Sequence, residues 1–265
     1  MDNFIDERDY KILEADKYTF FVLTRIMSRN CELLLSDHKR LIICYSQSPF
    51  PVWIWTADDA TSEEMENAYK ISDEHGFLDG KHGINMKYEL AEYFIKRAGE
   101  EGKKLSILKN MFAYDCPKPV TEEKIRKVDG ELYHCTMADL ETLTDFKEIF
   151  HTELKIDMTD REGYRTASKA LIEDGHVYLW KNSDGSFVAS CDFRVTNNMA
   201  SLSLVFTRPE FRRKHYAENL VYQVTKIAAK DGYLPMLYTD ADYTASNACY
   251  VKIGYILRGK LCTIG

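Results

Sequence analysis

The chain has 265 residues, of which 45% are hydrophobic and 12% aromatic, and its formal net charge is −7. A chain of this length and composition can bury a core in one large domain or in two domains of ordinary size. The acidic balance argues against general binding of nucleic acid and against a polybasic membrane surface, so we expect neither as a partner.

The compartment is indicated by the cysteines and by the start of the sequence. No apolar run reaches the ~18–20 residues of a membrane span, and MDNFIDERDY is too acidic for a signal peptide. Seven scattered cysteines without a CxxC pair are typical of a reducing cytosol. The adjacent His134 and Cys135 lack a second pair at zinc-site spacing, so no metal is expected. We predict a cytoplasmic protein.

Residues 1–115 predict alternating helices and strands. Residues 10–29 have helical spacing, and the β-rich runs RLIICYS and PVWIWT follow around a turn at QSPFP. Thr61 and Glu64 form the capping box of a helix that ends near Gly76. A second amphipathic helix, MKYELAEYFIKRAGEEGKK, precedes the strand-like LSILKNMFAY. In PVWIWT, both tryptophans share one strand face, which favours core or interdomain packing.

The predicted boundary between two domains is residues 116–130, a charged stretch with two prolines and no apolar stripe. After it, LYHCTM predicts a strand, and ADLETLTDFKEIFHTEL and DREGYRTASKALIEDG predict helices. The order continues with two strands joined by SDG, a third strand MASLSLVFT and a helix to about Lys230. It ends with the strand LPMLYTD, the helix ASNACYVKIG and the strand YILRGKL. We predict a mixed α/β (α+β) sheet rather than a doubly wound one.

Three consecutive cations, Arg212, Arg213 and Lys214, lie where the third strand gives way to a helix. The start of a helix carries unpaired backbone N–H groups and a partial positive charge. Clustered cations are mildly unfavourable there, so either solvent screens them or an anion such as a diphosphate binds. Both interpretations are open from the residues alone.

From Arg212 to Ala217 the sequence reads RRKHYA, preceded by TRPEF. This stretch resembles motif A of the GNAT superfamily of acyl-CoA-dependent N-acetyltransferases, in which a strand passes through Arg/Gln-x-x-Gly-x-Gly/Ala into a helix. LYTDADYTASNACYVKIGY, residues 237–255, resembles motif B of the same family. The resemblance implies a GNAT acetyltransferase domain at 131–265. Residues 1–115 are then an additional α/β domain of unknown role, either a degenerate GNAT-like half or a wall of the acceptor pocket.

The sequence departs from motif A at His215, where the family has glycine. Glycine lets the backbone approach a pyrophosphate without a Cβ atom. We expect a helical backbone conformation at this position, which histidine can adopt. The side chain is then expected to point at the phosphates or out to solvent.

The resemblance also implies roles for individual residues toward acetyl-CoA. One backbone N–H at the end of the third strand faces the thioester oxygen, where it stabilises the oxyanion. Tyr250 donates a proton to the departing CoA thiolate, since a phenol with an ordinary pKa of about 10 is protonated at neutral pH. Pantetheine is bound by Val205, Phe206, Thr207 and Asn247, and the pyrophosphate by the loop Arg212, Arg213, Lys214, His215, Tyr216 and Ala217.

The group that deprotonates the acceptor amine is left open. The strand MASLSLVFT has no carboxylate, and strict alternation puts Leu202, Leu204 and Phe206 on one face and the residues between them on the other. Ser201 and Ser203 are able to order a water, but a hydroxyl is a poor base. Asp192 is a better base chemically, although a surface carboxylate is the commoner interpretation. Asp240 is expected to cap the next helix.

These observations predict a transferase that moves an acetyl group directly from acetyl-CoA to a primary amine of a small molecule or peptide. Cys249, beside Tyr250, has no histidine neighbour in the sequence and is interpreted as a buried thiol rather than a nucleophile. Two alternatives are a non-catalytic CoA-binding module and a transferase for another acyl-CoA. Either a monomer or a homodimer is compatible with the sequence.

Overall fold

The computed structural model describes residues 1–154, 156 and 159–265, which form two compact units. The first unit contains residues 1–114, 238–242 and 257–265, and the second contains residues 115–237 and 243–256. The boundaries drawn from the sequence (1–115, 116–130 and 131–265) stay a prediction. The structure adds that two late segments of the chain are part of the first unit.

The first unit is a mixed sheet with the strand order β1-β2-β3-β4-β11-β5. Its β1, β2 and β3 are antiparallel, β3 and β4 are parallel, and the last strand of the chain lies antiparallel to β4 with Cys262 opposite Met86. The short strands β1 and β4 were not predicted from the sequence. The elements are α1 (Glu7–Ile12), α2 (Phe21–Met27), β1 (Leu33–Ser36), β2 (Leu41–Tyr45), β3 (Val52–Thr56), α3 (Ser62–Glu74), β4 (Ile84–Met86), α4 (Tyr88–Glu100), β5 (Ile107–Asp115) and β11 (Ile256–Ile264).

Two apolar clusters fill the two faces of this sheet. Alternate residues of β3 point to opposite faces. Val52 and Ile54 pack with α3 and α4, whereas Trp53 and Trp55 pack with α2 and the turn before it. Both indoles are buried, and the Trp55 Nε1 donates a hydrogen bond to Asp16 at 2.7 Å. The prediction that the tryptophans are packing residues is confirmed.

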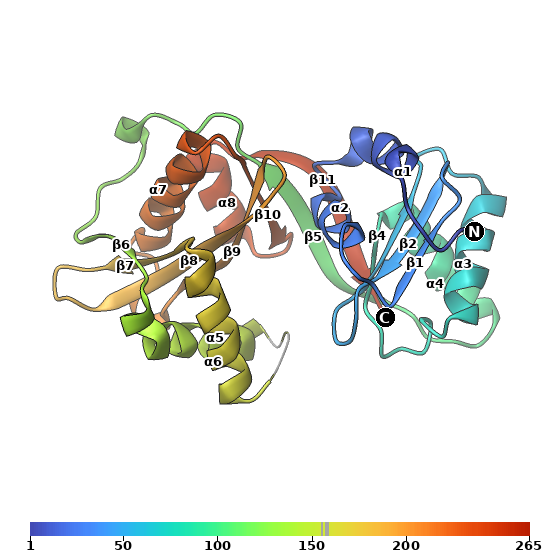
Figure 1. Ribbon diagram of the computed structural model, residues 1–265, viewed down its shortest axis with the longest axis horizontal. Coiled ribbons are helices and arrows are strands. Elements are labelled where there is room, and N and C mark those ends of the chain that lie inside the picture. Colours follow the sequence, from blue (N-terminus) through green and yellow to red (C-terminus); the bar gives the residue numbers. More distant parts are fainter. Residues whose placement is uncertain (155, 157–158) are drawn as a thin grey trace. The chain divides into compact units, whose positions relative to one another are not determined.

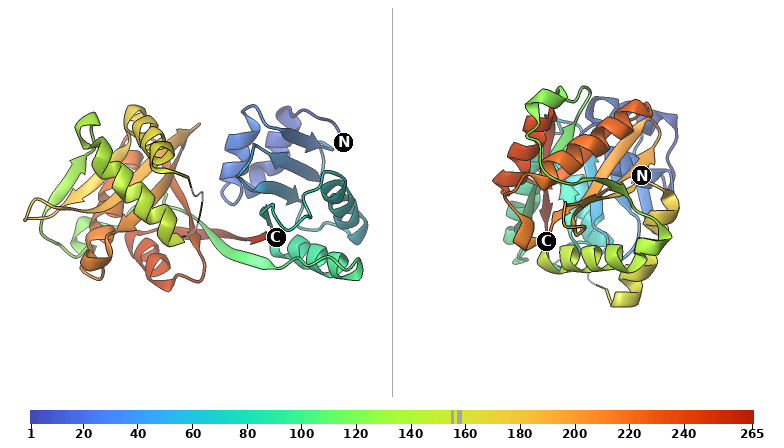
Figure 2. Two further views of the ribbon diagram at one scale, coloured as in Figure 1. Left: turned by 90° about the horizontal axis from the view of Figure 1, so that it is seen from below. Right: turned by 90° about the vertical axis from the view of Figure 1, so that its left-hand side faces the viewer.

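Residues 131–265 have the predicted order of elements and confirm the mixed α/β class, but the closing strand β11 belongs to the sheet of the first unit, so the second unit ends with α8. Its sheet has the order β10-β9-β8-β7-β6, with α7 on one face and α5 and α6 on the other (Figures 1 and 2). No helix within the described residues combines the length and apolarity needed to cross a bilayer. The elements are β6 (Glu131–His134), α5 (Leu140–Leu154), α6 (Arg161–Asp174), β7 (Val177–Lys181), β8 (Phe187–Thr196), β9 (Met199–Thr207), α7 (Tyr216–Lys230), β10 (Leu234–Asp240) and α8 (Thr244–Ile253).

A bulge in β9 corrects the predicted alternation of its side chains. Ser190 of β8 lies opposite Phe206, but Asp192 lies opposite Ser203, so β9 has one residue too many between these pairs. The extra residue is Leu204, whose φ of 50° is in the left-handed region, and its carbonyl accepts a hydrogen bond from the Ser190 hydroxyl at 2.9 Å. Ser203 therefore faces the same side as Leu204 and Phe206, toward α5 and α6.

Candidate active site

The first turn of α7 exposes backbone donors. The N-cap residue, His215, makes no side-chain capping bond. Within the described part of the chain, the N–H groups of residues 213–218 have no hydrogen-bond partner. Unpaired donors at a helix start, together with the helix dipole, form a site that favours an anion.

Two of the three clustered cations are available at this helix start. Arg213 and Lys214 are exposed, and neither makes an ion pair among the described residues. Arg212 has a different role, because its guanidinium binds the Thr207 carbonyl at 3.0 Å and the Glu153 carboxylate at 2.7 Å. Arg212 therefore ties the loop to the end of β9 and to α5, while its two neighbours supply positive charge.

The structure corrects the expected backbone conformation of His215. Its φ of 65° and ψ of 14° lie in the left-handed region, where glycine is favoured and a Cβ atom is strained. Its ring is 37% exposed and has two partners: Nδ1 bonds the Glu218 carboxylate at 2.9 Å, and Nε2 accepts from Arg126 at 3.3 Å. These two contacts hold the strained residue in place.

Glu218 is the centre of this support. Its side chain is only 6% exposed and also binds the Lys252 ammonium of α8 at 2.6 Å. Burial opposes its charged form, but the hydrogen bonds from Lys252 and His215 lower the pKa of Glu218 below its ordinary value. The sequence analysis missed Glu218, Lys252 and Arg126, since no spacing rule joins residues 92 and 34 positions apart.

The end of β9 offers further unpaired groups. Parallel pairing of β9 with β10 stops at Ser201 and Met236. Within the described residues Phe206 and Thr207 therefore have a strand partner on the β8 side alone, and Val205, in the bulge, has no partner in that register. The Thr207 Oγ1 is buried without a hydrogen-bond partner, and the same holds for Arg208 Nε. An orphaned hydroxyl beside a free strand edge fits an amide-rich ligand such as pantetheine.

The residues predicted on α8 lie in the same unit. Tyr250 is buried with its ring 5.8 Å from that of Tyr255, and burial raises its pKa well above the ordinary value. The Asn247 amide donates to the Tyr243 carbonyl at 3.0 Å, one turn back on its own helix. Burial raises the pKa of the Cys249 thiol to about 12, so it is not a nucleophile at neutral pH.

Asp192 and Asp240 both differ from what the sequence led us to expect. Asp192 is not a surface residue: it is 1% exposed and accepts a hydrogen bond from the Ser203 hydroxyl. Burial raises its pKa. Asp240 does not cap α8, whose N-cap is Tyr243 without a side-chain bond; instead its carboxylate accepts from the Asp242 N–H at 2.9 Å.

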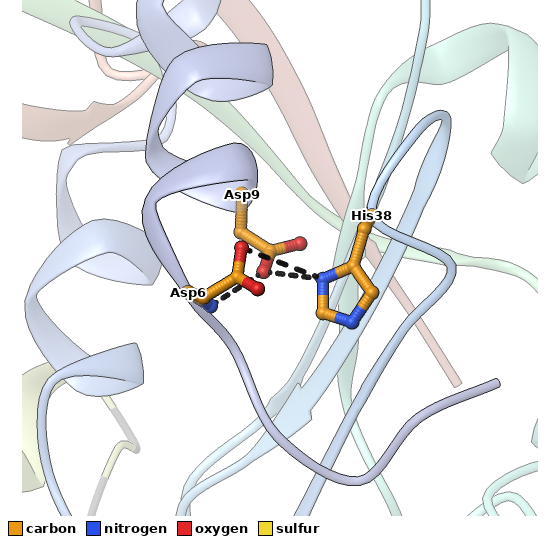
Figure 3. A group of neighbouring side chains, drawn as sticks. All are labelled: Asp6, Asp9 and His38. Carbon is orange, nitrogen blue, oxygen red and sulfur yellow. Dashed lines mark hydrogen bonds and ion pairs between the residues drawn. The ribbon is translucent and has the colours of Figure 1, made fainter.

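One group of candidate metal ligands occurs among the described residues, and it belongs to the first unit. Figure 3 shows Asp6, the N-cap of α1, and Asp9 within that helix turned toward His38. The His38 ring bonds Asp9 at 2.8 Å and Asp2 at 3.1 Å. Asp9 also accepts from the Asp6 N–H and from the Ser36 hydroxyl. The group is thus an internal hydrogen-bond network.

Comparisons with known proteins agree with this geometry. The model of the FR47-like protein family matches residues 183–264, which include both resembling motifs. No curated protein matches in sequence. Two similar solved structures are GCN5-related N-acetyltransferases: one from Kribbella flavida (13% identity, 95% of this chain and 94% of that one, TM-score 0.62) and one from Sphaerobacter thermophilus (12%, 87% and 81%, 0.61).

A third, a GNAT-family acetyltransferase from Colwellia psychrerythraea, is 13% identical, with 88% and 83% of the two chains covered and a TM-score of 0.57. At such identity the likeness establishes the fold and leaves the reaction to be argued from the residues. The predicted resemblance is confirmed: the chain has the fold of the GNAT acetyltransferases.

Proposed function

We propose that the protein is an N-acetyltransferase that moves the acetyl group of acetyl-CoA directly to a primary amine. The observation that carries this proposal is the start of α7, where unpaired N–H groups at 213–218 meet two exposed cations. Arg213 and Lys214 lie directly before this helix of 15 residues, and neither makes an ion pair among the described residues, so both charges are available to an anion. The free edge and orphaned Thr207 hydroxyl at the end of β9 extend the same site.

In this proposal the phosphates and the pantetheine occupy different parts of the second unit. Backbone groups from Arg213 to Ala217 bind the pyrophosphate, and Arg212 anchors the loop. The edge of Val205, Phe206 and Thr207 binds the pantetheine amides, with Asn247 as a further partner. Because the bulge at Leu204 releases backbone from the ladder with β8, an N–H there is available to the thioester oxygen.

Tyr250 is the proposed general acid for the CoA thiolate. Its raised pKa keeps the phenol protonated throughout the physiological range, so the proton is present when the thiolate forms. A buried thiolate is also more basic than one in water, which favours the transfer. Direct attack of the amine needs no acyl-enzyme, and Cys249 is too weakly acidic to form one.

The acceptor is proposed as a primary amine of a small molecule or peptide. Neither its identity nor the oligomeric state, monomer or homodimer, follows from the site. All seven cysteines are free, a usage typical of cytoplasmic proteins, and we keep that location as part of the proposal.

Two measurements test the proposal. Calorimetry with CoA is expected to show binding that the double substitution Arg213→Ala and Lys214→Ala weakens at least tenfold, whereas Lys127→Ala, an exposed control, leaves it unchanged. Free-thiol release from acetyl-CoA is then followed with a panel of primary amines. No binding of CoA at millimolar concentration would contradict the proposal at its first step.

A second candidate function is a CoA-binding module without turnover. The left-handed His215 favours it, because a Cβ at this position keeps a phosphate further from the backbone than glycine does. Binding of CoA without thiol release from acetyl-CoA, or from longer acyl-CoA donors, across the amine panel would support the module. Release from the longer donors alone would indicate an acyltransferase with another donor.

A further inference from the structure

We propose that Ser203 and Asp192 form the proton acceptor for the amine, with Ser203 contacting the amine and Asp192 receiving the proton through it. The inference rests on the proposed function, since it assigns the base that acetyl transfer requires. Three observations support it: the position of the pair beside the bulge, the burial of Asp192, and the exposure of Ser203.

The pair lies where the proposed thioester site begins. Ser203 immediately precedes Leu204, whose left-handed backbone forms the bulge. Asp192 is directly opposite Ser203 in the register of β8 and β9, and the Ser203 hydroxyl donates to Asp192 Oδ1. A proton taken up at Ser203 therefore has a direct hydrogen-bonded path to the carboxylate.

A proton relay needs one exposed group that contacts the substrate and one buried group that receives the proton, and Ser203 and Asp192 differ in exposure in this way. Asp192 is 1% exposed, so a substrate does not reach it, whereas Ser203 is exposed. A buried carboxylate without a strong ion pair is a better proton acceptor than one in water. The raised pKa of Asp192, caused first by burial, agrees with this role.

Three charged groups act on the Asp192 carboxylate from the elements around it. Arg194 on its own strand and Lys147 on α5 favour the charged carboxylate, and Asp174 on α6 opposes it. On β7, the residue opposite is the apolar Val177.

The proposed step balances as follows. The ammonium of the acceptor gives one proton to the Ser203 oxygen while the Ser203 hydroxyl proton passes to Asp192, which becomes a neutral acid. The lone pair of the amine forms the new C–N bond to the thioester carbon, and the C–S bond breaks as Tyr250 protonates the sulfur. The second proton that the nitrogen then carries is released to solvent water, which leaves the neutral amide. Asp192 and Tyr250 return to their starting states by exchange with solvent.

A structural role for the pair is the competing explanation, because the Ser203–Asp192 bond also pins the bulge. The two roles differ in their dependence on the amine. A base is needed by a strongly basic amine, which is protonated at neutral pH, and much less by 2,2,2-trifluoroethylamine, which is largely unprotonated there. Loss of a pinned bulge slows both amines alike and weakens CoA binding.

The experiment compares the full-length wild type with Asp192→Asn and Ser203→Ala, and uses Ser201→Ala as the matched control on the same strand. Thiol release from acetyl-CoA is measured against pH with spermidine, a lysine peptide, benzylamine and trifluoroethylamine, and the Kd for CoA is measured by calorimetry. We expect Asp192→Asn to lower kcat/KM about a hundredfold for the basic amines. The loss with trifluoroethylamine is expected to be below about tenfold, with the Kd unchanged. If Asp192→Asn does not fold, Ser203→Ala shows the same selective loss at smaller size.

Each other outcome is decisive. Equal losses for all amines, or a parallel rise in the Kd for CoA, overturn the relay and leave a structural pair. Unchanged rates in both variants overturn it while acetyl transfer stands. Binding of CoA without thiol release by the wild type overturns the proposed function and the relay together.

Discussion

The two units of the molecule share an order of elements but differ at the helix that follows their third strand. In each, two helices precede three antiparallel strands, after which come a helix, a parallel strand and a second helix. The strand that follows along the chain, β5 or β11, belongs in both cases to the sheet of the first unit. In the first unit the start of α3 is closed by its own side chains: Thr61 accepts from the Glu64 N–H, and the Glu64 carboxylate accepts from the Thr61 N–H at 2.7 Å. In the second unit α7 has no such cap.

The loops that precede these two helices also differ in charge. The loop before α3 carries Asp58 and Asp59, where the loop before α7 carries Arg213 and Lys214. Beside it, a cavity of about 90 Å³ at the end of β3 is lined by Thr56 and Lys87, and the Lys87 ammonium binds Asp16 at 2.6 Å and also Asp58. A helix start becomes an anion site when its donors are left unpaired and cations surround it, and of these two helices α7 meets both conditions and α3 does not.

The shared order favours the first of the two interpretations of residues 1–115, a degenerate GNAT-like half, and we propose it. The start of α3, which corresponds to the proposed phosphate site, is closed by its own capping box, and Asp58 and Asp59 lie in the loop before it. We therefore expect the acyl-CoA chemistry to belong to the second unit alone.

The largest expected effect comes from giving α7 the charges of α3. Replacing Arg213 and Lys214 by aspartate reverses two charges at the anion site, and each lost charged hydrogen bond is worth about 1.5–3 kcal/mol. We expect the affinity for CoA to fall at least about a hundredfold, measured by calorimetry. The neutralising change Asp58→Asn in the first unit is the control. An unchanged Kd in the aspartate variant would remove the basis of the comparison.

A second effect tests how α7 tolerates histidine at a glycine position. Glu218→Ala leaves Lys252 and His215 without their buried partner, which we expect to lower the free energy of unfolding by about 2 kcal/mol in urea titrations. The affinity for CoA should fall as well, because the loop loses its support. Lys226→Ala, which removes only a half-exposed pair with Glu122 at 3.5 Å, is the control and should change little. Equal stabilities of the two variants would show that Glu218 does not hold the loop.

The cap of α3 provides the third test. Thr61→Ala removes the side-chain bond to the Glu64 N–H and should cost about 1 kcal/mol of stability. Because that helix binds no ligand in our account, the affinity for CoA should not change. At α7, His215→Ala removes no cap, so a loss of CoA affinity there would reflect the loop alone. A CoA affinity that fell with Thr61→Ala would indicate a ligand site in the first unit.

How far the sequence predicts this contrast depends on whether the signal is local. The capping box at Thr61 and the cationic run at 212–214 are adjacent in sequence, and both are in the structure as predicted. The bulge at Leu204 is invisible to alternation, because one inserted residue leaves the apolar pattern intact. Strict alternation therefore placed Ser203 on the wrong face of β9, and its pairing with Asp192 was not predicted.

Contacts between residues far apart in the sequence could not be predicted either, because they leave no local pattern. The position of β11 beside β4 depends on contacts between residues 262 and 86, and no local pattern encodes them. The network of Glu218, Lys252 and Arg126 likewise joins three separate segments. The contacts of this network explain how a histidine is held in the left-handed conformation at the glycine position of motif A.

The smallest and most specific expected effect concerns Asp192 and the pH dependence of stability. Burial raises its pKa in the folded protein above the unfolded value of about 3.9, so the folded state holds the proton more tightly. Ionising Asp192 therefore costs stability at neutral pH, and this cost disappears as pH falls below about 4, where the carboxyl is protonated in both states.

Asp192→Asn should accordingly unfold at higher urea concentration than the wild type at pH 7, with the advantage shrinking to nothing as pH is lowered toward 4. Ser201→Ala on the neighbouring strand should show no such trend. If Asp192 is a catalytic carboxylate whose burial lowers stability, Asp192→Asn should be more stable than the wild type and should transfer acetyl groups to basic amines more slowly. A variant less stable than the wild type at pH 7 would instead mark Asp192 as a structural partner of the bulge.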